Sequence, residues 1–106
     1  MNFTSLLERH AAERPDAVAF HDAGRPLSYR ELRDESRRVA SLLYARGVMP
    51  GDRLALWLPN CTAWLATFMA CARLGVTVIS MNTRFRSGEV GDLVSRGRCR
   101  WLVMWP

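Results

Sequence analysis

The chain has 106 residues, 49% of them hydrophobic and 24% charged, and its 15 basic residues against 10 acidic ones give a net charge of +5. This profile excludes a disordered or fibrous protein, and the length allows one hydrophobic core but not two full domains. Every basic residue is an arginine, so the chain by itself cannot carry out chemistry that needs a Schiff-base lysine, a phosphate-loop lysine or a lysine on an adenylate.

The first third of the chain is predicted to form a short helix and a hairpin. Ser5 stands three residues before a glutamate, the spacing of a capping box, which predicts a helix from there to about Glu13. Residues 17–20 have the pattern of a short strand. Residues 22–26 have the composition of a turn, which leads to a second extended piece at Leu27.

A second capping box, formed by Ser28 and Glu31, predicts a longer helix. This helix is expected to end near Arg46, because Gly47 follows at the position where a left-handed cap is favoured. Apolar residues recur within it at near-helical spacing and are predicted to form its buried stripe: Tyr29, Leu32, Val39, Leu42 and Leu43.

Beyond that helix, the pattern changes to apolar strands that alternate with helices. Residues 54–58 are apolar without alternation, as expected of a strand that is covered on both faces in a parallel sheet. Asn60 is predicted to be the N-cap of an apolar helix over residues 62–74, and Gly75 is predicted to close it.

The last third repeats the same alternation. Residues 76–80 and 101–104 are predicted strands, and between them lies a short helix that Ser87 is predicted to cap. The order predicts an α/β fold in which an N-terminal hairpin is followed by alternating helices and a mostly parallel sheet. Because the final apolar strand has no helix after it, we expect an incomplete sheet.

The sequence contains no recognisable signal for export or membrane insertion. Its longest nearly apolar run, residues 63–72, is half the roughly 20 residues that cross a bilayer. The three cysteines, Cys61, Cys71 and Cys99, form no C-x-x-C pair, so neither a disulfide framework nor a zinc site is predicted. We therefore expect a cytoplasmic location.

The candidate catalytic and metal-ligating residues are few. His10 and His21 lie on different predicted elements, without metal-like spacing, and are interpreted as surface or partly buried side chains. Cys61 stands at a helix N-terminus, where the helix dipole lowers a thiol pKa, but without an identifiable base it is interpreted as packed or idle. The glycines form no nucleotide-binding motif. We assign no catalytic, cofactor-binding or metal-binding residue.

Five arginines form the densest basic cluster: Arg84, Arg86, Arg96, Arg98 and Arg100. Such a cluster is compatible with a phosphate-binding patch for nucleic acid or for a coenzyme. The alternative is that these arginines are solvated helix ends, and we favour it because no aromatic residues are interleaved with the charges. The four tryptophans stand within or beside apolar runs and are predicted to belong to the core: Trp57, Trp64, Trp101 and Trp105.

Six short motifs occur in the order and spacing that are typical of adenylate-forming enzymes. The sequence L-S-Y-R-E-L at 27–32 resembles the L-T/S-Y-x-E-L motif near the start of these enzymes. The other motifs are G-V at 47–48, P-G-D-R at 50–53, L-P-N at 58–60, A-R-L-G-V at 72–76 and M-N-T-R through E-V at 81–90. Two departures are Thr83, where proline is common, and Arg73, where lysine often stands. Neither departure removes a known catalytic group.

The chain therefore resembles the N-terminal fragment of an adenylate-forming (AMP-binding) enzyme of the acyl-CoA synthetase type. Residues 1–106 would be a partial N-terminal subdomain, which needs the remainder of the N-terminal domain to cover its sheet. The resemblance implies an enzyme that activates a fatty or aryl acid with ATP and Mg²⁺ and transfers the acyl group from an acyl-adenylate to coenzyme A.

The working parts of that family lie later in its longer chain, and no position of this sequence matches them. We therefore expect the chain alone to be inactive and to bind no cofactor. Two alternatives remain open from the sequence. A freestanding, non-catalytic α/β binding module would be monodisperse and would unfold cooperatively. A basic nucleic-acid binder would lose affinity steeply as salt rises.

Overall fold

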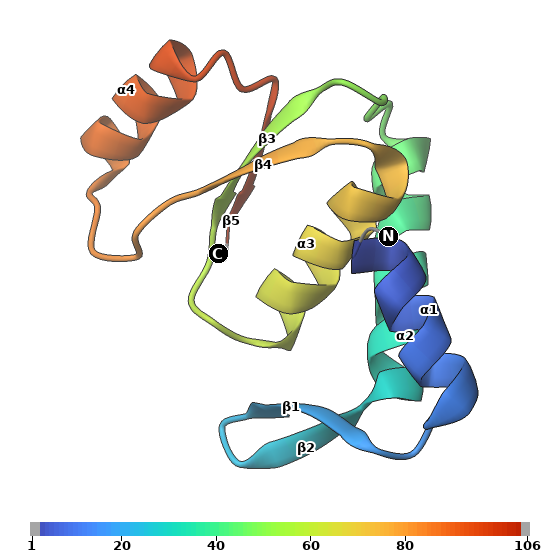
Figure 1. The fold of residues 1–106 in the computed structure, drawn as a ribbon. Helices are drawn as coiled ribbons and strands as arrows, with labels where there is room; N and C mark the ends of the chain where they lie inside the picture. The colour runs from blue at the N-terminus through green and yellow to red at the C-terminus, as the bar shows by residue number, and fades with distance from the viewer. Residues whose placement is uncertain (1–2, 105–106) are drawn as a thin grey trace.

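The computed structural model describes residues 3–104. Within that range, helices and strands follow one another as drawn in Figure 1. The helices are α1 (Phe3–Glu13), α2 (Tyr29–Ala45), α3 (Thr62–Leu74) and α4 (Ser87–Arg96). The strands are β1 (Val18–Asp22), β2 (Arg25–Ser28), β3 (Arg53–Trp57), β4 (Thr77–Ser80) and β5 (Trp101–Met104).

A parallel three-stranded sheet in the order β4-β3-β5 lies at the centre of the fold. Leu54 of β3 pairs with Val78 on one side and with Trp101 on the other. Helix α3 lies on one side of this sheet, together with α1 and α2, and α4 lies on the other side (Figure 1). Strands β1 and β2 form a separate antiparallel hairpin. The predicted α/β fold, with its hairpin and parallel sheet, is confirmed.

The hydrophobic core lies where β3 meets α3 and the turns beside them. Six buried residues form this cluster: Val48, Leu54, Leu56, Leu58, Cys71 and Val76. Trp64 and Trp101 pack against it, as predicted, and Trp57 is partly buried. The prediction for Trp105 falls outside the described residues.

Helix α2 confirms its predicted start and corrects its predicted stripe. The Ser28 hydroxyl accepts from the Glu31 amide at 3.1 Å, and the Glu31 carboxylate accepts from the Ser28 amide at 3.0 Å. Leu42, however, is 50% exposed. The buried positions are Leu32, Ser36 and Ala40. This spacing of four residues with two small side chains allows neighbouring helices to approach closely.

The predicted bounds of α3, residues 62–74, are confirmed, but its predicted cap and the predicted starts of α1 and α4 are wrong by one or two residues. Helix α1 already begins at Phe3, so Ser5 lies inside it. Cys61, not Asn60, is the N-cap of α3, and Arg86, not Ser87, is the N-cap of α4. At α4 the Glu89 carboxylate accepts from the Arg86 amide at 3.4 Å, and this contact does not require a hydroxyl at the cap.

Glycines set the ends of several elements. Gly47 and Gly75 have φ angles of 98° and 74°, and they close α2 and α3 as predicted. In the hairpin, Ala23 and Gly24 have φ angles of 51° and 83°. Two such residues form a tight hairpin turn, so β1 continues to Asp22, beyond the strand end that the sequence predicts.

Candidate functional site

The carboxyl edge of a parallel sheet is the usual place for a ligand. Here β3 and β4 end at Trp57 and Ser80. The Trp57 indole nitrogen donates to the Asn82 carbonyl at 3.1 Å, and the Asn82 side-chain oxygen accepts from the Arg84 amide at 2.9 Å. The polar groups of the M-N-T-R motif thus hold the β4–α4 loop against the end of β3.

The P-G-D-R motif lies at the opposite edge of the sheet and binds a distant part of the chain. The Asp52 carboxylate accepts from the Met49 amide and from the Trp101 indole nitrogen, both at 2.9 Å. These two hydrogen bonds, the Met49 one first, hold the pKa of Asp52 below its ordinary value. Arg53 donates to the Gly97 carbonyl at 2.9 Å. The motif therefore joins the start of β3 to the segment around β5.

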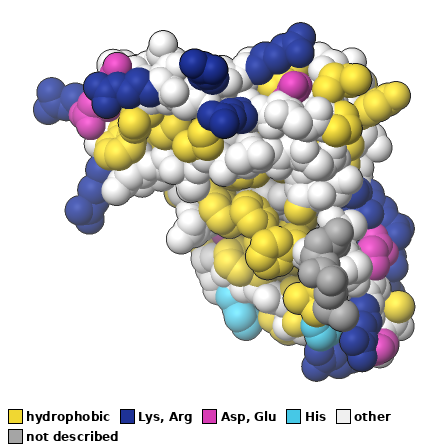
Figure 2. Space-filling model, turned by 45° about the horizontal axis from the view of Figure 1, so that its top comes forward, with side chains coloured by type: hydrophobic (Ala, Val, Ile, Leu, Met, Phe, Trp, Pro, Cys, Tyr) yellow, Lys and Arg dark blue, Asp and Glu magenta, His cyan; other side chains and the backbone are white. Residues whose placement is uncertain are grey.

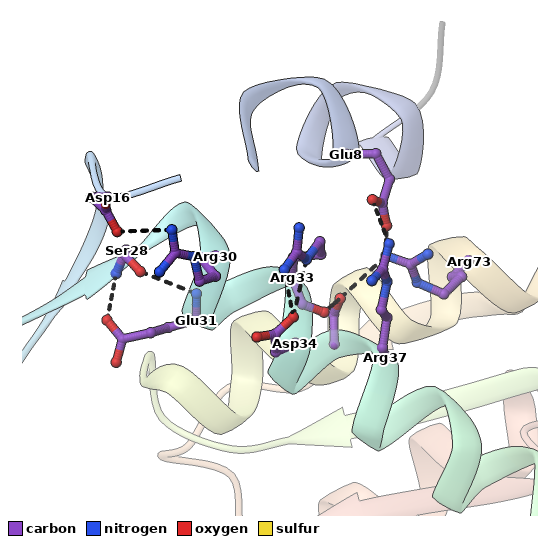
Figure 3. Close-up of polar contacts among 10 residues, drawn as sticks. Glu8, Asp16, Ser28, Arg30, Glu31, Arg33, Asp34, Arg37 and Arg73 are labelled. Carbon is purple, nitrogen blue, oxygen red and sulfur yellow. Dashed lines mark hydrogen bonds and ion pairs between the residues drawn. The ribbon is translucent and has the colours of Figure 1, made fainter. Parts of the chain in front are cut away.

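A group of charged residues joins the first three helices. The Glu8 carboxylate of α1 receives hydrogen bonds of 2.7 Å from Arg73 of α3 and from Arg37 of α2. Arg73 also lies 3.5 Å from the hydroxyl of the buried Ser36. Figure 3 shows these side chains converging from three helices. Arg73, at the position where lysine often stands in the motif, contributes here to packing between helices.

The hairpin is attached to α3 through Asp22. Its carboxylate accepts from the Thr62 hydroxyl at 2.7 Å and from the Thr62 amide at 3.0 Å. The side-chain bond first, and then the backbone bond, keep the pKa of Asp22 below its ordinary value. Asn60 was predicted to accept a hydrogen bond from the first turn of α3, and the Asp22 carboxylate of the hairpin accepts one there instead. Its negative charge also interacts favourably with the helix dipole.

A groove of about 460 Å³ lies beside this contact, between the hairpin and α2, and four carboxylates line it. Each has a partner: Asp22 binds Thr62, Glu31 binds Ser28, Asp34 pairs with Arg33, and Glu35 pairs with Arg38. Within residues 3–104, no three His, Cys, Asp or Glu side chains are arranged to hold a metal ion. Each carboxylate that lines the groove therefore already makes a hydrogen bond or an ion pair within this chain.

The sequence candidates occupy separate places. His10 is partly buried, stacks on Tyr29 with ring centroids 5.0 Å apart, and lies 2.7 Å from Arg14 through its Nδ1. His21 is exposed in the hairpin. Cys61 is a free, partly buried thiol at the start of α3. These positions agree with the interpretation of the two histidines as surface or partly buried groups.

The basic cluster at the end of the chain is exposed throughout: Arg84, Arg86, Arg96, Arg98 and Arg100. Arg96 pairs with Asp92 at 3.0 Å in the last turn of α4. A cation at this end of a helix also interacts favourably with the helix dipole. Arg100 lies 3.9 Å from Asp52 and stacks over Trp101. These contacts agree with solvated ends of secondary-structure elements.

The comparisons with known proteins agree with the motifs. A family model described as AMP-binding enzyme matches residues 7–104. The chain belongs to this family. A (methyl-dioxo-octahydro-indenyl)propanoyl:CoA ligase from Mycobacterium tuberculosis is 36% identical over 92 residues, which are 87% of this chain and 18% of that protein. The human mitochondrial medium-chain acyl-CoA ligase ACSF2 is 33% identical over 86% of this chain and 15% of its own.

Solved structures of the same type share the fold. The inhibitor-bound N-terminal domain of FACL13 from Mycobacterium tuberculosis has a TM-score of 0.91 at 27% identity, over 97% of this chain and 26% of that chain. The N-terminal subdomain of NpsA from Klebsiella oxytoca also has a TM-score of 0.91, at 20% identity. The chain therefore spans less than a fifth of the curated relatives and is part of an AMP-binding domain. The two alternatives considered from the sequence are not favoured.

The sequence predicted the motif residues but not their partners. The contacts of Glu8 with Arg73, and of Asp22 with Thr62, join residues that are far apart in the chain, and no local spacing indicates them.

Over residues 3–104, no helix is both long enough and apolar enough to cross a membrane.

Proposed function

We propose that residues 1–106 are a partial N-terminal subdomain of an AMP-forming acid–CoA ligase that acts on a fatty or aryl acid. The match of the AMP-binding family over residues 7–104 carries this proposal. The relatives support it, because those named above are CoA ligases of carboxylic acids. The family and its acyl-CoA ligase members imply the use of ATP and CoA. The family resemblance adds Mg²⁺ and an acyl-adenylate.

The contribution of this chain is structural. Asp52, Arg53 and Asn82 belong to family motifs. The side chains of Asp52 and Arg53 and the backbone carbonyl of Asn82 are each hydrogen-bonded to a distant part of this chain. The carboxylates of the groove are also engaged, and the chain has no lysine. Because the working motifs of the family match no position of this sequence, we assign the binding of ATP and Mg²⁺, and all catalytic groups, to other parts of such an enzyme.

A hybrid enzyme tests the proposal. Residues 7–104 would replace the matched segment of human ACSF2, and the exchange of labelled pyrophosphate into ATP would be measured with short, long and aromatic acids. We expect acid-dependent exchange from the hybrid and from unaltered ACSF2, and none from the 106-residue chain alone. Exchange by the chain alone would contradict the structural role. A folded hybrid that exchanges with no acid would contradict the proposed function.

The proposed location is the cytoplasm. Three free cysteines, Cys61, Cys71 and Cys99, support it. Because the human relative is named as mitochondrial, cell fractionation with an antibody against the chain is the direct test. Recovery in an organelle or membrane fraction would contradict this location.

A further inference from the structure

The charged group that joins the first three helices contains two cations and one anion. The Glu8 carboxylate binds Arg37 with one oxygen and Arg73 with the other, both at 2.7 Å. Each arginine uses only its Nη2 in this contact. A guanidinium has five N–H donors, and a carboxylate or phosphate frequently accepts two of them. Both arginines therefore have donors that an acceptor from solution can use.

Arg73 is poorly solvated for a charged side chain. It is 22% exposed, and within residues 3–104 its Nε is buried and has no hydrogen-bond partner. Its second contact, 3.5 Å from the Ser36 hydroxyl, again uses Nη2. A buried donor without an acceptor is unfavourable, especially in a charged group. Because the charge of a guanidinium is delocalised over its three nitrogens, an anion beside Arg73 would offset part of this cost.

A groove between α2 and α3 gives an anion access to both arginines. It has a volume of about 340 Å³, and six residues line it: Arg37, Ala40, Ser41, Tyr44, Arg73 and Leu74. Both charged residues of this lining are basic, whereas four carboxylates line the groove beside the hairpin. Figure 2 shows basic side chains, with acidic ones among them, on the side of the molecule that α1 and α2 form. The purely basic lining therefore differs from the mixed surface around it.

We propose that this groove binds a small organic oxyanion, namely a carboxylate or a phosphate monoester that carries a short apolar group. The oxyanion accepts hydrogen bonds from Arg37, Arg73 and the Ser41 hydroxyl. The apolar group lies against Leu74 and the ring of Tyr44. The bound anion connects α2 to α3, as Glu8 connects both helices to α1. This inference does not rest on the proposed function.

The proposal gives a role to the arginine at position 73, where the motif often has lysine. A lysine ammonium can pair with Glu8, but it lacks the planar fork that holds an oxyanion through two parallel hydrogen bonds. Arg73→Lys should therefore keep the contact with Glu8 and weaken the binding of the anion several-fold. If Arg73 served helix packing alone, this substitution would leave anion binding unchanged.

The test titrates the 106-residue chain with phenyl phosphate and with benzoate, and uses benzyl alcohol as the neutral control. Calorimetry would give the affinities, and NMR would follow the Nε–H signal of Arg73. We expect this signal to shift with at least one of the two anions and to stay in place with benzyl alcohol. Inorganic phosphate should bind several-fold more weakly than phenyl phosphate, because it has no apolar group.

Ser41 allows a variant that alters the groove and leaves the ion pairs of Glu8 in place. Because Ser41 is exposed on α2, Ser41→Glu should fold normally and place a competing carboxylate beside the arginines. We expect it to weaken anion binding tenfold or more. Ser41→Gln, which is of equal size and neutral, is the matched control and should bind like the unaltered chain. Glu8→Gln should bind the anion several-fold more tightly, because the two cations no longer share a carboxylate.

Three results would overturn the site. The first is equal affinity of Ser41→Glu and Ser41→Gln for the anions. The second is a Nε–H signal of Arg73 that stays in place with both anions, whether or not signals of the basic cluster at the end of the chain shift. The third is binding of benzyl alcohol as tight as that of the anions, because the arginines would then contribute nothing.

Discussion

Arg73 donates a 2.7 Å hydrogen bond to Glu8, although 65 positions separate the two residues in the chain. Arg37 donates to the other oxygen of the same carboxylate. The contact connects α1 to both α2 and α3. Burial of the carboxyl raises the pKa of Glu8, but the hydrogen bond from Arg73 and the charge of Arg37 outweigh burial, so this pKa lies below its ordinary value of 4.5.

Replacing Glu8 should loosen this junction. In Glu8→Gln, Arg73, whose side chain is 22% exposed, loses its carboxylate partner. We expect the free energy of unfolding to fall by about 1 kcal/mol, since the site is partly solvated and the lost bonds are charge-assisted. Urea denaturation followed by circular dichroism would measure it. Glu13→Gln, which removes an exposed pair with Arg9, is the control and should change little. Equal effects of the two substitutions would contradict the role of Glu8.

Acid should destabilise the fold through its bonded carboxylates. The pKa values of Glu8, Asp22 and Asp52 lie below their ordinary values of 4.5, 3.8 and 3.8. Below those ordinary values the unfolded chain binds more protons than the folded chain, so stability is complete above them and is lost as pH falls through the folded pKa values. Urea midpoints at pH 7, 4 and 3 should therefore decrease. Asp22→Asn should flatten this decrease, and an unchanged pH profile in that variant would rule out a contribution from Asp22.

The three thiols should react at very different rates. Cys71 is fully buried, and burial raises its pKa to about 11. Cys61 and Cys99 are partly exposed, and burial also raises the pKa of Cys99. Because the thiolate is the reactive form, iodoacetamide should modify Cys61 first, then Cys99, and Cys71 only after unfolding. Peptide mass spectrometry of timed samples would give the order. Rapid modification of Cys71 in the folded chain would contradict the core position of α3.

Two glycine-to-alanine substitutions should have opposite effects. Gly75 has a φ of 74°, and an added Cβ would meet Pro50 at an ordinary 3.6 Å, so Gly75→Ala is strained by its backbone rather than by crowding. It should cost about 1 kcal/mol. Gly88 is helical with open space around it, so Gly88→Ala should stabilise by about 0.5–1 kcal/mol. Thermal unfolding of both variants would compare them, and the same sign in both would be inconsistent with this account.

Local signals in the sequence were sufficient for much of the fold. The capping box of Ser28 and Glu31 and the left-handed cap at Gly75 each depend on neighbours within a few residues. The unbroken apolar run around Leu54 is likewise a local signal, because it is typical of a strand that is covered on both faces. Such interactions persist wherever the segment is placed, so the elements and the α/β order were predictable. The spacing of the motifs added the family, which the match over residues 7–104 confirms.

The packing of these elements was decided by interactions between distant segments. The hydrogen bond at the start of α3 comes from Asp22 and not from Asn60, because the hairpin places a carboxylate beside that helix. Ser36 is buried and Leu42 is exposed, because α1 and α3 pack against the side of α2 that carries Ser36. A single segment carries no record of which neighbour will complete its hydrogen bonds or cover its apolar side. Periodicity and caps thus determined the secondary structure of this chain. Its ion pairs and the partial exposure of the aromatic side chains of α3 depend on the tertiary arrangement, because burial and charge pairing belong to surfaces that meet only after folding.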